Sequence, residues 1–370
     1  MHHSTDFTLK RSIKAIVLLM FIATWQLVYG QTDKEKAMEK EKDAIQLMET
    51  EKADSSILLL EEAQKLDPAS FDIPYELAYA HYLRKEYTQA INILEKIENH
   101  KNVTDRLYQL LGNSYDNIHK GNKAVEVYED GLKKFPNSGY IYLESGILFY
   151  NKKEDLKALN YFEKGIEVAP EFSSNYYWAA KIFFRTTEQV WGMIYGELFM
   201  NLERNSERTA EMSKLLFDTY KNEIKITGEN TFSVSFSKNT TINIKNQKKT
   251  DKIKLPFGPG VYEQTLMISM LSVKSIDMNT LDTIRSNFVD NYYLKGYNKT
   301  YPNVLFSYQK KVKEAGHIES YNHWILMKGD DDGFEDWLSV NKVKWESFRK
   351  WFSANSLKLN NSNKFFRGQY

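Results

Sequence analysis

A 34-residue spacing of small and large residues constrains this chain more than any other feature. Counted from Asp105, small residues stand at positions 8 and 20, and a proline stands at position 32. The pattern is carried by Tyr108, Leu111, Gly112, Tyr115, Ala124, Tyr128 and Pro136. Small residues let two helices approach closely, large apolar residues fill the space around that contact, and proline ends the second helix. Residues 105–138 therefore predict a hairpin of two helices.

The pattern returns when the register is moved by 34 residues in either direction. The register from Gly139 holds Tyr142, Gly146, Phe149, Ala158, Phe162 and Pro170. The two earlier registers match in part, with Leu77, Ala78, Ala90 and Leu94 in the one from Phe71, and with Ala44, Leu47, Leu60, Ala63 and Pro68 in the one from Ala37. Four consecutive registers predict a repeat array made of 37–70, 71–104, 105–138 and 139–172.

Over roughly residues 37–206 the chain resembles the tetratricopeptide repeat (TPR) family. The resemblance implies a right-handed superhelix of helical hairpins, an α-solenoid, which binds other proteins in its concave groove. It does not imply any chemistry. In the family the first helix of each hairpin lines that groove. The candidate peptide-binding residues are then Tyr75, Tyr79, Tyr82, Asn113, Tyr140, Leu143, Tyr150 and Tyr177. Tyrosine offers a large contact area at a small entropic cost, and Asn113 is suited to holding a ligand backbone.

The pattern weakens in a fifth register, 173–206. Gly192 and Gly196 occupy positions 20 and 24, so a large residue is lost where the second helix should pack. We expect this degenerate hairpin to meet a partner unlike a standard repeat. The next amphipathic stretch, Thr209 to Ile224, is a candidate capping helix, which would close a TPR array spanning residues 31–223.

The first thirty residues are typical of a secretory signal peptide. Three basic residues precede an apolar run from Ala15 to Trp25, and small or tolerated residues lead up to Gly30. We expect cleavage after Gly30 and hence an exported protein of the periplasm or cell envelope, with secretion as an alternative. The other interpretation is an uncleaved anchor extending through Tyr29, which would be the chain's contact with the membrane.

Composition excludes several classes of function. The chain has no cysteine, which rules out a lipoprotein anchor, disulfide bonds, thiol chemistry and Cys-ligated zinc. Its formal net charge of +1 gives no field that would recruit nucleic acid or an anionic membrane. The partner that the TPR resemblance implies, another protein or a peptide segment, is compatible with this composition.

Residues 224–370 predict a mostly helical C-terminal domain with a small β-hairpin. Strict alternation over 232–236 and again over 242–244 predicts its two strands, at about 231–245, with a third near 253–255. Two strands alone are marginally stable, so the hairpin should lean on a helical partner. Helices are expected at Tyr262–Ser275, Thr280–Tyr293, Val304–Ala315, Ile318–Lys328 and Phe334–Ser353. The fold class is thus mainly α.

The last expected helix carries an aromatic stripe. Its members are Phe334, Leu338, Trp345, Phe348 and Phe352, with Trp337 and Trp351 beside them. Such a stripe is typical of a face that packs into a core, and an exposed aromatic binding face is the alternative.

No group of residues predicts catalysis, a metal or a cofactor. The acidic run Asp330–Asp332 does not fit the spacing of a calcium loop, and Asp331 or Asp332 is expected to cap the last helix. His317 and His323 are six residues apart and do not share a helix face as a metal pair would. The expected function is a non-catalytic scaffold for protein–protein interaction.

Two rival hypotheses remain open at this stage. In the first, the C-terminal half is an uncharacterised enzyme or ligand-binding module that docks through the array. A pocket uniting Asn291, Tyr292, His317, His323 and the acidic run at Asp330 would favour it. In the second, the C-terminal half fills the groove. That hypothesis predicts that residues beyond 224 bury Tyr79, Tyr82, Tyr140 and Tyr150.

Overall fold

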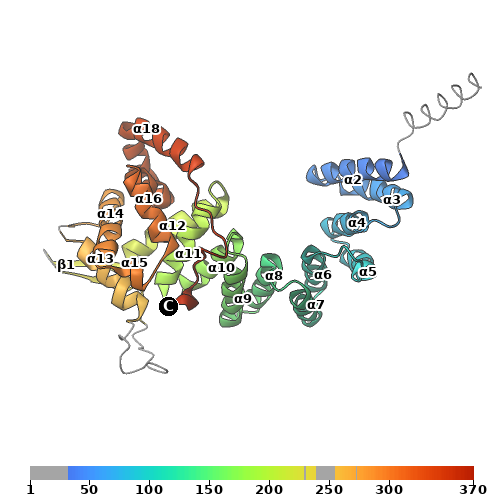
Figure 1. Cartoon of the computed structure of the whole chain (residues 1–370), viewed down its shortest axis with the longest axis horizontal. Coiled ribbons are helices and arrows are strands. Elements are labelled where there is room, and N and C mark those ends of the chain that lie inside the picture. Colours follow the sequence, from blue (N-terminus) through green and yellow to red (C-terminus); the bar gives the residue numbers. More distant parts are fainter. Residues whose placement is uncertain (1–31, 229–230, 239–254, 272) are drawn as a thin grey trace, which may run out of the picture. The chain divides into compact units, whose positions relative to one another are not determined.

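The computed structural model describes residues 32–228, 231–238, 255–271 and 273–370 (Figure 1). These residues are mainly α-helical and contain one two-stranded antiparallel hairpin. They divide into two compact units, the first ending at Val127 and the second beginning at Tyr128. The expected signal peptide and the strand expected at 242–244 lie outside the described residues. Within the described ranges, no helix combines the length and apolar character needed to cross a membrane.

Unit 1 is a run of helices that pack in the order in which they occur. Each of α2 to α5 contacts the helix that follows it. The helices are α2 (Asp33–Glu49), α3 (Ala53–Leu66), α4 (Asp72–Leu83), α5 (Tyr87–Ile97), α6 (Asp105–Asn117) and α7 (Gly121–Lys134). The boundary between the two units falls inside α7. The small residues Ala78 and Gly112, each at position 8 of its register, are buried. The hairpins expected from the 34-residue spacing are therefore present in this unit.

A left-handed residue recurs at position 15 of the first four registers. Glu51, Lys85, His119 and Lys153 have φ values of 60°, 62°, 61° and 63°. Each follows the last turn of a first helix, and the next residue's N–H donates to the carbonyl five residues back at 2.9 Å. This is the hydrogen bond that closes a helix C-terminus when the chain turns into the left-handed region. The repeat is thus visible in backbone geometry as well as in residue types.

Unit 2 begins with two further hairpins, built from α8 (Gly139–Asn151), α9 (Asp155–Val168), α10 (Ser173–Phe183) and α11 (Gln189–Leu202). A Cβ atom placed on Gly146 of α8 would lie 2.3 Å from a ring atom of Phe162 on α9. Only glycine therefore allows the two helices their present separation. The small residue at position 8 has the role that the sequence predicted for it.

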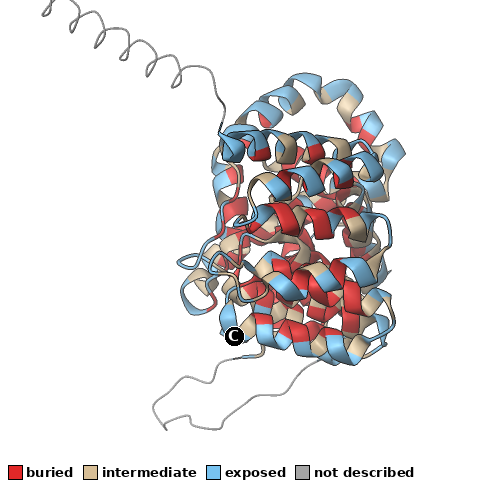
Figure 2. Ribbon diagram, turned by 90° about the vertical axis from the view of Figure 1, so that its right-hand side faces the viewer, coloured by how far each residue is buried: buried red, intermediate tan, exposed pale blue. Residues whose placement is uncertain are grey.

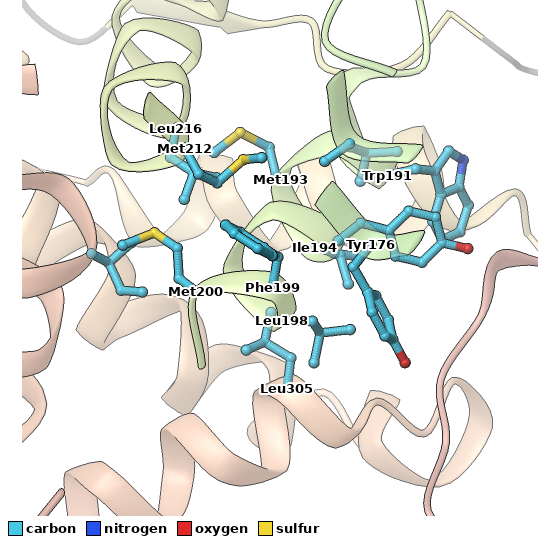
Figure 3. Packing of buried hydrophobic residues seen from close by; sticks show 14 of the residues in the cluster. Tyr176, Trp191, Met193, Ile194, Leu198, Phe199, Met200, Met212, Leu216 and Leu305 are labelled. Carbon is cyan, nitrogen blue, oxygen red and sulfur yellow. The ribbon is translucent and has the colours of Figure 1, made fainter. Parts of the chain in front are cut away.

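Helix α11 is enclosed by other helices. Every residue from Val190 to Asn201 is buried, and the helix packs on α10, on α12 (Glu207–Glu223) and on α16 (Val304–Glu314). A Cβ atom on Gly196 would lie 2.6 Å from the sulfur of Met212 on α12. Figure 3 shows Met212 in the cluster of buried hydrophobic residues. The fifth hairpin therefore meets a partner unlike a standard repeat, as its degenerate pattern predicted.

The remainder of unit 2 is helical except for the hairpin. Its helical segments are a π-helical turn (Gly258–Tyr262), α13 (Glu263–Ser269), α14 (Met278–Leu294), α15 (Tyr297–Thr300), α16, α17 (Ile318–Leu326), a 3-10 turn (Met327–Gly329), α18 (Asp331–Ala354) and a second 3-10 turn (Arg367–Gln369). They enclose a core of buried residues that includes those of α11. Figure 2 marks the buried residues along the ribbon in red.

The hairpin differs from the expected one in its first strand. Strand β2 (Thr231–Val234) falls where the first strand was predicted, but it pairs with β1 (Ile224–Gly228), which precedes it. The expected capping helix stops at Glu223, because Ile224 is already extended and pairs with Val234. The hairpin does lean on a helix, since the N–H of Val190 on α11 donates to the carbonyl of Phe236 at 3.0 Å.

The last helix confirms the core interpretation of its stripe and corrects its cap. Phe334, Trp337, Phe348 and Phe352 are buried. The capping residue is Asp330, whose carboxylate accepts from the N–H of Gly333 at 3.1 Å, and neither of the two residues that the sequence favoured. Asp331 and Asp332 lie instead in the first turn of α18, where carboxylates interact favourably with the helix dipole.

The C-terminal tail returns to the fourth and fifth hairpins. Arg367 donates through Nε and Nη2 to the Glu163 carboxylate on α9, at 2.9 and 2.6 Å. Its backbone N–H donates to the Tyr195 hydroxyl on α11 at 2.8 Å, and Lys364 Nζ donates to the carbonyl of Glu167 at 2.7 Å. Residues near the end of the chain thus form hydrogen bonds with the second helices of the fourth and fifth hairpins.

Candidate functional site

The eight candidate residues fall into two groups, one in each unit. The first group, which we call surface A, comprises Tyr75, Tyr79 and Tyr82 on α4 and Asn113 on α6. Its tyrosines are spaced four and three residues apart, which places them along one side of the helix. Tyr79 is 38% exposed, and the other three are half-buried. Surface A is therefore accessible to a ligand.

A short hydrogen-bond chain joins the two helices of surface A. Asn117 Nδ2 donates to the Tyr82 hydroxyl at 3.3 Å and to the carbonyl of Asn113 at 2.8 Å. The link fixes the end of α4 relative to α6. The repeat pattern places Asn117 at a groove position, but its link to Tyr82 was not anticipated.

Carboxylates adjoin surface A. Burial, together with the like charges of Glu41 and Asp72, raises the pKa of Glu76 to about 7. Burial also raises the pKa of Glu41, with Asp72 acting in the same direction. Crowded carboxylates repel one another, so the Glu76 carboxyl is partly protonated near neutral pH.

The second group lies on α8 and α10, and only part of it is accessible. Tyr140 and Tyr150 are half-buried, whereas Leu143 and Tyr177 are buried. The Tyr177 ring packs 5.1 Å from that of Phe199 on α11, and its hydroxyl hydrogen-bonds to Glu211 of α12. Tyr177 is thus part of the contact among α10, α11 and α12, and it presents no surface to a ligand.

Trp178 occupies the accessible position next to Tyr177. Its ring lies 5.0 Å from that of Tyr150, edge to face, and it is half-buried. We call Tyr140, Tyr150 and Trp178 surface B. The sequence analysis missed Trp178 because the repeat pattern places Tyr177, one residue earlier, on the groove side.

Cationic side chains lie over the rings of surface B. Lys181 Nζ is 5.4 Å from the centroid of Trp178, and Arg185 Cζ is 5.1 Å from that of Tyr150. Both cations also pair with carboxylates, Lys181 with Glu211 at 2.8 Å and Arg185 with an aspartate of α9 at 3.2 Å. Surface B is therefore aromatic and bordered by paired cations, whereas surface A is aromatic and bordered by carboxylates and by Arg106.

The hypothesis that the C-terminal half fills the groove predicted burial of four tyrosines. Tyr79, Tyr82, Tyr140 and Tyr150 are all at least partly exposed. The ring contacts of Tyr140 and Tyr150 include Phe172 and Trp178, both of which precede residue 224. Within unit 2, the burial of Tyr140 and Tyr150 that this hypothesis predicted is therefore not found.

The side chains proposed for a C-terminal active site do not converge. Asn291 donates to the Ser269 hydroxyl at 3.0 Å, and the Tyr292 hydroxyl donates to the carbonyl of Tyr301. His317 packs against aromatic rings of α18, and Asp330 caps that helix. His323 stacks on Trp337 at 4.1 Å. Each of these residues has its own structural contact, and no group of His, Asp and Glu in the described residues is arranged to hold a metal ion.

A buried polar cluster was not anticipated. Glu197, 3% exposed on α11, accepts hydrogen bonds from Arg285 at 2.7 Å, from Gln309 at 2.6 Å and from Tyr321 at 2.9 Å. Arg285 also donates to Asn322 at 2.9 Å. The signal was present in the sequence, because Glu197 is the lone charged residue within α11, but its partners lie 88 or more residues away.

The cluster has a structural character. Burial opposes the charge on Arg285, but the adjacent Glu197 carboxylate outweighs this effect and holds the Arg285 pKa well above its usual value. The cavity beside the pair has a volume of about 20 Å³, enough for one water molecule. A substrate has no room there, so the cluster joins α11 to α14, α16 and α17.

A sequence model described as a tetratricopeptide repeat matches residues 47–113. Residues 47–113 are tetratricopeptide repeats. The matched segment includes α4 and most of α6, which carry surface A. No curated protein matches the chain. TPR modules are scaffolds for protein–protein interaction, and the fold suggests that role here.

Several solved TPR structures are similar to about half of this chain. TTC0263, a thermophilic TPR protein of Thermus thermophilus, has 14% identity over 49% of this chain and 98% of its own, with a TM-score of 0.42. PilF of Pseudomonas aeruginosa has 17% identity over 51% and 84%, with a TM-score of 0.43. YrrB, described as a TPR protein with an unusual peptide-binding site, has 15% identity over 47% and 90%, with a TM-score of 0.33.

Proposed function

We propose that this protein is an exported, non-catalytic TPR scaffold of the bacterial cell envelope that binds another protein or a peptide segment. The observation that carries the proposal is the accessible row of tyrosines on α4, held in place by the Asn117 link. Aromatic side chains on rigid helices give contact area without a large loss of entropy on binding. Surface B, with its cation-covered rings, is a second candidate contact area.

The non-catalytic part of the proposal is supported by the scatter of the C-terminal polar residues described above. Export is supported by the sequence of the first thirty residues. Mass spectrometry of the protein recovered from the producing cell tests it directly. A mature N-terminus at Gln31 in the envelope or secreted fraction is the expected result, and an intact Met1 in the cytoplasmic fraction would contradict export.

Affinity capture with matched variants tests the binding surfaces. We expect Tyr79→Ala with Asn113→Ala to lose partners that the unaltered protein retains, and Tyr150→Ala with Trp178→Ala to lose them in part. Tyr161→Ala is the control, because Tyr161 is a half-buried aromatic residue on the second helix of its hairpin. Identical captured proteins from all three variants and the unaltered protein would remove both surfaces from consideration.

A further inference from the structure

A pocket in unit 2 combines aromatic walls with two arginines. It has a volume of about 250 Å³ and lies where the loop between α11 and α12 meets α17 and α18. Its aromatic lining comes from Trp324, Trp345, Phe348 and Phe352, and Arg204 and Arg349 are its cations. Sites for drug-sized ligands start at about 300 Å³, so this pocket matches a single large side chain.

The aromatic rings form one continuous packed wall. The Phe348 and Phe352 rings stack at 4.8 Å, and Trp324 meets Phe352 edge to face at 4.8 Å. Trp345 lies 5.5 Å from Phe348 and is half-buried. Most of the stripe is core, as the sequence predicted, but the part that ends at Phe352 also borders this pocket. An entering aromatic ring would find edges and faces suited to it.

Arg204 is fixed in the pocket without a carboxylate partner among the described residues. Its guanidinium lies 3.7 Å from the centroid of Phe352 and donates to the carbonyls of Asn201 at 3.2 Å and Phe352 at 2.9 Å. The Nη2 atom of Arg204 is buried and has no hydrogen-bond partner among the residues that the structure describes. Burial lowers the Arg204 pKa, with Tyr308 and Tyr321 acting in the opposite direction. A half-buried cation without a counter-charge favours an incoming anion.

Arg349 adds a second, more accessible cation. Its side chain is 61% exposed, and its Nη1 pairs with Glu346 at 3.1 Å. Exposed pairs of this kind contribute little free energy, so a ligand carboxylate can replace Glu346 at small cost. The pocket thus offers one half-buried and one exposed guanidinium beside an aromatic wall.

We propose that this pocket binds an acidic peptide segment through an aromatic side chain flanked by carboxylates. The ring enters the space between Trp324 and Trp345, and the flanking carboxylates pair with Arg204 and Arg349. The occupant follows from charge complementarity and from the volume of the pocket. This site is separate from surfaces A and B and does not depend on them.

Calorimetric titration of the full-length protein tests the proposal with three short capped peptides. They are acetyl-Glu-Phe-Glu-amide, its neutral Gln-Phe-Gln analogue, and the Glu-Ala-Glu analogue that lacks the ring. We expect the first to bind and each analogue to bind about tenfold more weakly, as loss of a charge-assisted hydrogen bond or of ring burial implies. Equal affinity for the neutral or the ringless peptide, or no heat at millimolar peptide, would overturn the proposal.

Variants locate the binding. Arg204→Met keeps the apolar stem over Phe352 and should weaken the acidic peptide about tenfold, and Arg349→Gln about threefold. Lys350→Gln removes the same charge from an exposed neighbour outside the pocket and should change nothing. Arg349→Gln breaks only a surface pair, so it remains informative if Arg204→Met misfolds. Unchanged affinity in both arginine variants would overturn the assignment, whereas Tyr79→Ala with Asn113→Ala should bind like the unaltered protein.

Discussion

Two glutamates in the repeat region show how differently its hairpins are used. Glu76, on α4 of the second hairpin, is half-buried among other carboxylates, and its pKa is raised to about 7. Glu197, on α11 of the fifth hairpin, is 3% exposed and receives three hydrogen bonds from residues of the C-terminal half. The second hairpin therefore keeps a polar, ionisable face, whereas the fifth has been enclosed in a core.

The backbone makes the same distinction. The first four hairpins turn through a left-handed residue at position 15, and Thr187, at that position in the fifth, has no positive φ. In the fifth hairpin the segment after β2 bonds to the start of α11, through Lys238 N–H to the Thr187 carbonyl at 3.0 Å. The difference teaches that a repeat loses its pattern where another part of the chain supplies its contacts.

The largest expected effect comes from breaking the buried pair of the fifth hairpin. Glu197→Ala leaves the Arg285 guanidinium buried without its counter-charge, which typically costs about 3–5 kcal/mol of unfolding free energy. Denaturant unfolding followed by tryptophan fluorescence measures it. The matched control is Glu167→Ala, since Glu167 pairs at the surface with Lys164 and its loss should cost below about 1 kcal/mol. Equal losses in the two variants would show that α11 is no more enclosed than α9.

A smaller, pH-dependent effect is expected at Glu76. Because its pKa is raised from 4.5 to about 7 in the folded chain, the folded state favours the protonated acid. The stability that this contributes is complete below about pH 4.5 and is lost as the pH rises through 7. Glu76→Gln should flatten that decline and stabilise α4 by about 1 kcal/mol at pH 8, after allowance for screening.

Hydrogen exchange of α4 amides at several pH values checks the Glu76 prediction. Glu61→Gln, which removes an exposed carboxylate from α3, is the control and should leave the pH profile unchanged. A Glu76→Gln profile that still declines between pH 4.5 and 7 would assign the decline to other groups.

The smallest effect is expected at the left-handed turn of the fourth hairpin. Lys153 has a φ of 63°, which costs a side chain about 1 kcal/mol and costs glycine little. Lys153→Gly should therefore stabilise unit 2 by about 0.5–1 kcal/mol. Lys152→Gly, at a φ of −76°, should destabilise it by about as much. Thermal unfolding of the two variants measures both changes in stability. Destabilisation by both substitutions would contradict the left-handed backbone of Lys153.

The repeated hairpins could be predicted from the sequence because their determinants are local. Gly146 and Phe162 are sixteen residues apart, and their contact follows from a fixed spacing. The left-handed residues at position 15 went unnoticed because none is a glycine. Strand β1 was not predicted because Ile224 also fits the end of an amphipathic helix, and helix and strand periods coincide over so short a run.

The candidate site was predicted only in part. Tyr75, Tyr79 and Tyr82 were found because groove positions recur with the repeat, whereas Tyr177 was misjudged because the contact that buries it involves α12. Neither the Glu197–Arg285 pair nor the pocket at Arg204 follows from a local pattern. Each joins helices that lie far apart in the sequence, so only the folded chain brings its residues together.

The central claim is that α11, although it belongs to a repeat, is part of the core that the C-terminal helices close. Native-state hydrogen exchange across a denaturant series tests it most directly, because it gives an opening free energy for each helix. We predict that amides of α11 open together with those of α14, α16 and α17, and at a higher free energy than those of α2 to α5. Opening of α11 together with α2 to α5, while the C-terminal helices stay closed, would contradict the claim.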